Sequence, residues 1–455
     1  MTLEGNFLIV WLVFLLSALP MVALAATTKS IPMRDFFRNV QKGYFRLSPD
    51  GKYIAFMQPY ESRMNIHVQR RGSTAVKRIT GETARDISNL FWKGNNRILY
   101  VKDFGGDENF HLVAVDRNGG NLKDLTPFEG VRAQVIDDLR DHPTDVIVGL
   151  NKRNKEVFDA YRLNTFTAQL TLVAENPGNI TAWQTDHKGN IRIAITSDGV
   201  NTSLLYRATE KEPFRSVLTT NFKEQVNPLF FTFDNKHLYA ISNIGRDKAA
   251  VVEMDPATGK ERKVIFQHPE VDVAGMDYSR KRKVLTEIGY TTSKPERKVL
   301  DKETAAVYQA LEKKLPGYEI ILQNSNRAED IFIVAAHNDR TQGSRYLYEK
   351  RGDKLTKVTD LTPWLPESEM AEMKPITYES RDGLTIHGYL TLPKGKEAKN
   401  LPVVVNPHGG PWSRNVWGFN SEVQFLANRG YAVLQMNFRG STGYDQRFWE
   451  TSFKQ

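Results

Sequence analysis

The sequence contains no cysteine, which excludes disulfide bridges, zinc–thiolate centres and a cysteine nucleophile. Its nine histidines are scattered, and none falls in an H-x-x-x-H or H-E-x-x-H pattern. Closely spaced histidines of that kind are the usual sequence mark of a zinc site. We therefore expect neither a bound metal nor any other cofactor.

Long runs of charge of one sign are also scarce. The 62 basic and 53 acidic residues are interspersed, and the net charge is +9. The one dense basic run is Arg280-Lys281-Arg282-Lys283. A nucleic-acid patch is one interpretation of this run, but no recognition helix or RNA-binding signature accompanies it. A solvated loop fits better, and no nucleic-acid partner is expected.

Only one long apolar run is present, from Phe7 to Leu19. Pro20 ends it, and Ala23-Leu24-Ala25 follows with the A-x-A spacing of a cleavage site. This pattern predicts a signal peptide over residues 1–25, with cleavage after Ala25 and export of the mature protein to a bacterial periplasm. The acidic Glu4 and the absence of a preceding Lys or Arg are atypical. The alternative is an uncleaved membrane anchor, although the run is shorter than the ~20 apolar residues that a span needs.

Short β-rich runs alternate with turn residues between residues 43 and 359. In the clearest unit, 45–56, strands flank the tight turn Ser48-Pro49-Asp50-Gly51. Units of the same type recur at 90–101, 183–194 and 229–240, and a second hairpin type recurs at 112–125, 251–264 and 346–358. Repeats of about 40–50 residues are typical of propeller blades, which leaves room for about seven four-stranded blades. A β-sandwich or several small β domains is the alternative.

One helix is predicted before this array, and another interrupts it. Ile31 to Val40 is expected to form a short lead-in helix. Thr304 to Leu315 places Val307, Ala310, Leu311 and Leu315 on one helical face, and Pro316-Gly317 ends the pattern. We interpret this second helix as an amphipathic insertion that packs on the propeller, with a membrane or partner helix as the alternative. The propeller and its lead-in segment would then cover residues 26–362.

Residues 363–375 are rich in proline and charge and are expected to form an interdomain hinge. A hairpin over 376–393 follows, with its turn at Arg381-Asp382-Gly383. Beyond it, Val403-Val404-Val405 predicts a buried strand, Ser421 to Gln424 has the spacing of a capping box, Gly430 ends a helix, and Tyr431 to Met436 predicts a second strand. Strand, helix and strand in this order predict a βαβ unit with a parallel sheet.

The turn between the first strand and the helix carries the chemistry. His408-Gly409-Gly410-Pro411 follows the strand directly. Glycines let a backbone amide approach a ligand closely, and an HGGG-type loop supplies an oxyanion-hole amide in α/β-hydrolases. Such donors stabilise the charge that develops on a carbonyl oxygen during acyl transfer. A plain glycine turn is the alternative.

The continuation distinguishes these two interpretations. HGGPW, the helix, the G-Y-A-V-L strand and Asn437 to Tyr444 (NFRGSTGY) together resemble the start of the catalytic domain of the prolyl oligopeptidase family of serine peptidases, closest to its acylaminoacyl-peptidase and dipeptidyl-aminopeptidase-like branch. The resemblance implies a mainly β protein, with a seven-bladed propeller followed by an α/β-hydrolase domain that cleaves short peptides. It also implies that His408 occupies the position of an oxyanion-hole tyrosine in other branches, and that Gly409 and Gly410 are further oxyanion-hole candidates.

The nucleophile of such a protein is missing from this sequence. Its serine sits in G-x-S-x-G and is followed by Asp and then His. No serine here has glycine both two residues before and two residues after it, and Ser441, in R-G-S-T-G, matches a loop position. We therefore expect residues 376–455 to form an incomplete hydrolase domain without its triad, and the 455-residue chain to be inactive alone.

Two rival functions remain open. One is a non-catalytic periplasmic propeller that binds peptides or proteins, because such propellers share S-P-D-G-K turns. The other is a non-peptidase hydrolase such as an esterase, against which the large propeller argues. No pattern in the sequence indicates an oligomeric state.

Overall fold

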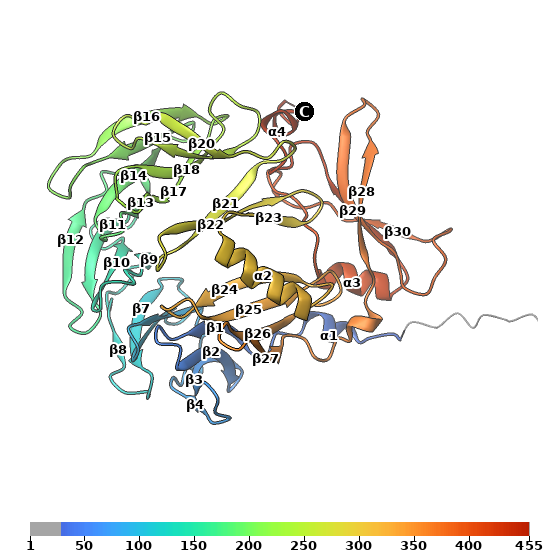
Figure 1. Ribbon diagram of the computed structural model, residues 1–455, viewed down its shortest axis with the longest axis horizontal. Coiled ribbons are helices and arrows are strands. Elements are labelled where there is room, and N and C mark those ends of the chain that lie inside the picture. The colour runs from blue at the N-terminus through green and yellow to red at the C-terminus, as the bar shows by residue number, and fades with distance from the viewer. Residues whose placement is uncertain (1–28, 455) are drawn as a thin grey trace, which may run out of the picture.

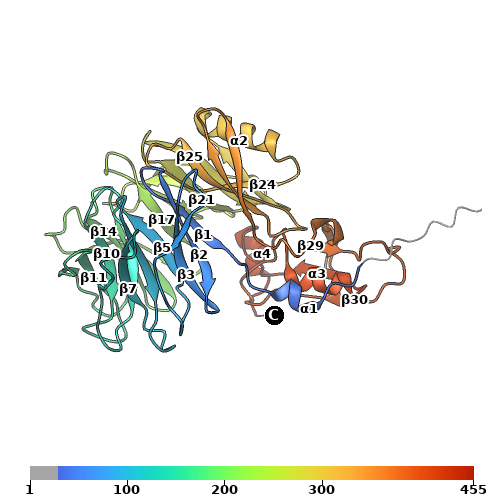
Figure 2. The same cartoon turned by 90° about the horizontal axis from the view of Figure 1, so that it is seen from below.

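The computed structural model describes residues 29–454, so the signal-peptide prediction lies outside the described residues. Seven antiparallel sheets follow one another along residues 43–360 and stand around a common axis as the blades of a propeller (Figure 1). An eighth, mixed sheet belongs to residues 373–454, called here the C-terminal segment, which packs to one side of the propeller (Figure 2). The predicted fold class is confirmed.

Within the described residues, six blades have four strands in chain order and one has three. The first three blades comprise β1 (Gly43–Leu47), β2 (Tyr53–Tyr60), β3 (Arg63–Arg70) and β4 (Val76–Arg78); β5 (Asn89–Lys93), β6 (Arg97–Lys102), β7 (His111–Asp116) and β8 (Lys123–Asp124); and β9 (Ala133–Asp137), β10 (Asp145–Leu150), β11 (Asp159–Asn164) and β12 (Leu170–Ala174). The next two comprise β13 (Ile180–Thr185), β14 (Ile191–Ser197), β15 (Asn201–Tyr206) and β16 (Arg215–Asn221); and β17 (Val226–Phe231), β18 (Leu238–Ser242), β19 (Ala250–Met254) and β20 (Glu261–Phe266). The last two comprise β21 (Val273–Ser279), β22 (Val284–Thr291) and β23 (Pro295–Val299); and β24 (Glu319–Ser325), β25 (Ile331–His337), β26 (Ser344–Glu349) and β27 (Lys354–Asp360).

The turn between β1 and β2 shows why the repeats were visible in the sequence. The Ser48 hydroxyl donates to Asp50 over 2.7 Å, and the amide of Gly51 donates to the Ser48 carbonyl over 2.8 Å. Gly51 has φ +71°, and a Cβ there would lie 2.8 Å from the Ile331 side chain in the last blade. Glycine is therefore required both by the turn and by the neighbouring blade.

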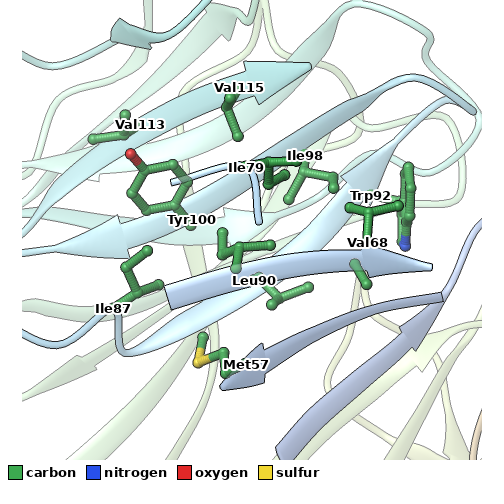
Figure 3. Packing of buried hydrophobic residues seen from close by; sticks show 12 residues of the cluster. Met57, Val68, Ile79, Ile87, Leu90, Trp92, Ile98, Tyr100, Val113 and Val115 are labelled. Carbon is green, nitrogen blue, oxygen red and sulfur yellow. The ribbon is translucent and has the colours of Figure 1, made fainter. Parts of the chain in front are cut away.

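The hydrophobic core lies between the blades, one cluster for each pair of neighbours. Between the first two blades, Met57 and Val68 face Leu90, Ile98 and other buried side chains of the next sheet (Figure 3). The ring closes in the same way, because Phe45 and other residues of the first blade pack on the last. The two ends of the propeller are thus joined by contacts between side chains and backbone of the first and last blades, without exchange of a strand.

The sixth blade departs from the prediction of four strands. Its third strand, β23, leads directly into α2 (Lys302–Lys314), whose N-cap Asp301 accepts a hydrogen bond from the Thr304 amide over 2.8 Å. The predicted apolar face of this helix is confirmed: Val307 and Leu311 are buried against the sixth and seventh blades. The helix therefore follows a three-stranded blade and covers the groove where the two blades meet.

The C-terminal segment contains β28 (Met373–Glu379), β29 (Thr385–Thr391), β30 (Val403–Val405), α3 (Ser421–Asn428), β31 (Ala432–Asn437) and α4 (Gln446–Glu450), and the 3-10 turn Glu367–Glu369 lies in the predicted hinge. The sheet order is β28-β29-β31-β30. β30 and β31 are parallel and α3 crosses between them, which confirms the βαβ unit. Trp417, Val423 and Val433 are buried in its core.

Two local predictions were wrong. The N-cap of α3 is Asn420, whose side chain accepts from the Val423 amide. Ser421 and Gln424 form no capping box because the Gln424 amide group is bonded instead to backbone groups of Asp339 and Ala371. β30 is also less buried than predicted: its Val403 is 59% exposed, because β30 is the edge strand of this sheet.

The segment before the propeller packs against the C-terminal segment. The lead-in helix is shorter than predicted, since α1 spans only Met33–Phe37. Phe36 meets Phe425 of α3 edge to face, with ring centroids 5.8 Å apart, and α1 lies beside α3 in Figures 1 and 2. Within residues 29–454, no helix has the length and apolar character needed to cross a membrane.

Candidate active site

The His408–Pro411 turn, called here the HGGP loop, lies at the carboxyl end of β30. β31 runs parallel to β30, so the loop that follows β31, residues 438–443, emerges at the same edge of the sheet. Loops at the carboxyl ends of parallel strands are the usual position of functional groups in α/β folds. The topology thus brings together the two motifs on which the sequence resemblance rests.

A serine–histidine contact joins the two loops. His408 Nε2 lies 2.7 Å from Ser441 Oγ, and the Ser441 hydroxyl is also 2.7 Å from the Phe438 carbonyl oxygen. The imidazole stacks on the Phe438 ring with centroids 4.2 Å apart, and its Nδ1 lies 2.8 Å from the Gly409 carbonyl oxygen. No local sequence pattern predicts this contact, because its two partners are 33 residues apart.

This pair does not have the geometry of a nucleophile and its base. Ser441 is 0% exposed, so a substrate carbonyl cannot reach its hydroxyl. Nδ1 of His408 faces a backbone carbonyl of its own loop, where a catalytic histidine would be oriented by a carboxylate. The contact instead fixes the position of the HGGP loop against the second loop.

The HGGP loop carries free backbone donors. Within residues 29–454, the amides of Gly409 and Gly410 donate to no acceptor, and both residues are exposed. Gly410 has φ +140°, and a Cβ there would lie 2.7 Å from the Trp412 nitrogen, whereas a Cβ at Gly409 would meet nothing within 4 Å. The assignment of His408, Gly409 and Gly410 to an oxyanion hole stays a prediction. The geometry favours the two amides as its donors, because the ring nitrogens of His408 already have partners.

Asn437, at the end of β31, anchors the chain that follows the HGGP loop. It is 0% exposed. Its Oδ1 accepts from the Asn415 amide over 2.7 Å, and its Nδ2 donates to the Asn415 carbonyl over 3.1 Å and to the Tyr444 hydroxyl over 2.7 Å. One buried side chain therefore links the segments that follow the two loops, and burial raises the pKa of Tyr444.

Arg414 ties the same region to the propeller. Its guanidinium lies 4.2 Å from the Tyr444 ring centroid and donates to the carbonyls of Thr291 and Thr292 at the end of β22. The amide of Asp272, ahead of β21, donates in turn to the Gly443 carbonyl over 3.3 Å. The two loops are thus attached to the sixth blade.

A cavity of about 450 Å³, called here the interface cavity, opens between the propeller and the C-terminal segment. Its aromatic wall is formed by Trp412, Trp449 and Phe222; the Trp412 and Trp449 rings meet edge to face at 5.6 Å. Trp412 lies two residues beyond Gly410, so one wall of the cavity follows the HGGP loop directly in the chain. Its volume lies within the range of about 300–1,000 Å³ that is usual for small-ligand sites.

The opposite wall is acidic. Asp272 and Asp445 line the cavity, and burial raises the pKa of Asp272, with Asp445 and Asp247 adding to the effect. Lys248 lies between Asp247 and Asp445, at 3.0 and 3.5 Å. Arg447 Nε lies 3.9 Å from Asp247, so two cations face three carboxyl groups and this wall can accept a further cation. Lys223 and Arg414 also line the cavity.

Metal chemistry finds no support in the described part of the chain. Residues 29–454 contain no group of three or more His, Asp or Glu side chains that could hold a metal ion. Covalent catalysis by serine would need a nucleophile other than Ser441, and the G-x-S-x-G pattern does not occur in the sequence. The residues described can supply substrate contacts and backbone amides.

Comparison with known proteins agrees with this geometry. The family model Acetyl xylan esterase (AXE1) matches residues 349–454. The chain is 33% identical to dipeptidyl aminopeptidase BIII of Pseudoxanthomonas mexicana, with 93% of this chain and 63% of the relative covered. It is 24% identical to dipeptidyl peptidase family member 6 of Caenorhabditis elegans, with 92% and 62% covered. The chain thus spans less than two thirds of these relatives' length.

A solved structure supports the fold. The puromycin-hydrolysing peptidase of Mycobacterium tuberculosis superposes with a TM-score of 0.68 over 93% of this chain and 70% of that one, at 16% identity. At this identity the likeness concerns the fold alone. Because the superposition covers 93% of this chain, the similarity of fold includes both the propeller and the C-terminal segment.

Proposed function

We propose, from the premise that this chain belongs to the prolyl oligopeptidase family of serine peptidases, that the HGGP loop is the oxyanion side of a peptidase active site. The observation that carries the proposal is the pair of free amides at Gly409 and Gly410 beside a cavity that both parts of the chain line. Amides held in this way stabilise the negative oxygen of a tetrahedral intermediate.

Each part of the site has a role in this proposal. The His408–Ser441 contact and Asn437 hold the loop, so that its amides need no rearrangement when charge develops. The aromatic wall around Trp412 takes apolar substrate side chains. The nucleophile, its base and the orienting acid are not among residues 1–455, and the covalent steps depend on them.

The substrates are short peptides with a free amino terminus. The acidic wall formed by Asp272 and Asp445 favours a substrate ammonium group, which an acylated residue lacks. This favours removal of dipeptides over removal of acylated residues, in the direction that the names of the two relatives also suggest. We propose export as well, on the basis of the apolar run from Phe7 to Leu19 and the A-x-A site at Ala23–Ala25.

Turnover of a dipeptide p-nitroanilide, together with labelling by a fluorophosphonate probe, tests this proposal. Purified residues 26–455 are expected to give neither turnover nor label. Turnover that a serine-directed inhibitor blocks would mean that the nucleophile lies within this chain. Secretion is tested separately, by N-terminal sequencing of the protein from a periplasmic extract, where the first residue is expected to be Ala26.

The match to an esterase model gives one second candidate function. It covers residues 349–454, the part of the chain that contains the HGGP loop. An oxyanion hole serves esters and amides alike, so that loop does not separate the two reactions. A longer form of the enzyme that hydrolyses acetylated sugars but no peptide would favour the esterase. Tight peptide binding by this chain, together with the absence of a nucleophile from the whole protein, would favour the non-catalytic propeller.

A further inference from the structure

Three cavities meet at the end of the propeller away from the HGGP loop. They have volumes of about 540, 280 and 210 Å³, and Arg140 and Tyr278 line all three. The length of β21 gives the distance between these three cavities and the interface cavity. Asp272, which lines the interface cavity, precedes this seven-residue strand, and Tyr278 lies near the other end of the strand. At about 3.3 Å per residue, the two sites are roughly 20 Å apart. This second site is called here the far mouth.

Two arginines at the far mouth have no hydrogen-bond or ion-pair partner in the described part of the chain. Within residues 29–454, the guanidinium groups of Arg140 and Arg280 donate no hydrogen bond and form no ion pair. Arg280 lies 5.6 Å from the Tyr278 ring centroid. Both cations are close enough to shift the pKa of Asp138 and of Tyr278, which places the four groups around one space.

Two carboxylates at the same place are also without partners. The Asp138 and Asp277 side chains accept no hydrogen bond and form no ion pair in the described part of the chain. Burial raises the pKa of both carboxyl groups. For Asp277, which is partly open to solvent, burial is the single cause of the raised pKa. A carboxylate in that situation is stabilised by any cation that reaches it.

Lys93, a neighbouring cation, differs from these groups because it has hydrogen-bond partners within the protein. Lys93 lines the same cavity, and its ammonium group donates to the carbonyls of Asp138 and Leu139 over 2.6 and 2.9 Å. Lys93 therefore has no need of a ligand. The unpartnered groups that remain are two guanidiniums and two carboxylates, next to the Phe230–Tyr278 ring pair at 4.4 Å.

We propose that the far mouth is a binding site for short peptides with both termini free, in which Arg140 and Arg280 hold the carboxylate and Asp138 and Asp277 hold the ammonium group. A zwitterion satisfies both sets of groups at once, whereas a simple anion or cation would satisfy one set and leave the other. The Phe230–Tyr278 pair offers an apolar surface to a peptide side chain. This site needs no nucleophile, so it does not rest on the proposed catalytic function.

Isothermal titration calorimetry of residues 26–455 with four probes tests the proposal. The probes are Ala-Phe with free termini, N-acetyl-Ala-Phe, Ala-Phe amide and inorganic phosphate. We expect saturable binding of Ala-Phe, and binding of both capped peptides that is weaker by about tenfold or more, because hydrogen bonds to charged groups contribute about 1.5–3 kcal/mol. Binding of phosphate but not of Ala-Phe would overturn the proposal in favour of a plain anion site.

Variants assign the binding to these residues. The double variant Arg140→Gln/Arg280→Gln should weaken Ala-Phe about tenfold or more and leave Ala-Phe amide nearly unchanged. Asp277→Asn should weaken Ala-Phe but not N-acetyl-Ala-Phe. Arg381→Gln is the matched control, because Arg381 is an exposed arginine in the β28–β29 turn and has no partner within residues 29–454. It should leave all four titrations unchanged.

Trp412→Ala separates this site from the interface cavity. Trp412 is 56% exposed and lines only the interface cavity among those described, so its loss should not affect Ala-Phe binding at the far mouth. Ala-Phe binding that Trp412→Ala abolishes, or that the double arginine variant leaves intact, would overturn the proposal. So would the absence of saturable Ala-Phe binding by the unaltered chain.

Discussion

Asn437→Ala should destabilise the C-terminal segment without unfolding the propeller. The substitution removes three hydrogen bonds at 2.7, 3.1 and 2.7 Å from a side chain that is 0% exposed. At about 1 kcal/mol net for each bond, the loss is about 3 kcal/mol, before any cost of leaving the Asn415 amide unpaired. This would raise amide exchange about 10²-fold, since each 1.4 kcal/mol is a factor of ten.

Hydrogen exchange followed by mass spectrometry measures this directly. The amides of β31, which pair with β29 and β30, should exchange faster, while those of β6 in the second blade should not change. Asn179→Ala is the matched control: Asn179 is exposed, its side chain has no hydrogen-bond partner in the described part of the chain, and its loss should affect neither region. Unchanged exchange in β31 would refute the view that Asn437 links the segments that follow the two loops. Faster exchange throughout the propeller would refute the view that the segment opens separately.

Two further predictions concern the propeller. Asn324→Ala should lower the midpoint of thermal unfolding, because this side chain links the last blade to the first through the Leu47 amide at 2.9 Å and the Phe45 carbonyl at 2.8 Å; an unchanged midpoint would mean that packing alone closes the ring. Burial lowers the pKa of Lys93 from 10.5 to about 8, so between these values the unfolded state binds more protons and the free energy of unfolding should rise with pH. Urea titrations should show a rise of at most about 3 kcal/mol from pH 8 to 10.5 that Lys93→Met lacks, and equal pH profiles would contradict the assignment.

The repeats were predictable because their signals are local. A turn such as Ser48 to Gly51 fixes a hairpin through contacts within a few residues, and each blade is built from consecutive strands. The βαβ unit was predictable for the same reason, since its strands and helix follow one another in the sequence. Even the amphipathic face of α2 could be read from its spacing, although its place after a three-stranded blade could not.

Long-range contacts explain what the sequence did not reveal. Gln424 lies where a capping box would put it, but partners 53 and 85 residues away engage its side chain, and Asn420 caps the helix instead. The contact between His408 and Ser441 likewise depends on β30 and β31 being neighbours. The His408–Pro411 motif thus identified the oxyanion-hole candidates in the sequence. The contacts that hold these residues in place could be seen only in the structure.

The sequence indicated only part of the far mouth. The basic run that begins at Arg280 was visible, and its interpretation as a solvated loop agrees with its place in the turn between β21 and β22. Arg140 and Asp138 lie in a different blade, so no spacing in the sequence connects them to Arg280. Only closure of the ring brings these groups to one opening.

The most direct test of the proposed function is the value of kcat for Gly410→Ala in a longer protein that joins this chain to a nucleophile elbow, with a dipeptide p-nitroanilide as substrate. A Cβ at this position would lie 2.7 Å from the Trp412 nitrogen and displace the loop, whereas Gly289→Ala in β22, with open space around its Cβ, is the matched control. We expect a fall of about 10²–10³ in kcat with KM little changed, as for the loss of one oxyanion donor, and near-normal activity for the control. An unchanged kcat for Gly410→Ala would contradict the assignment of the HGGP loop to the oxyanion hole.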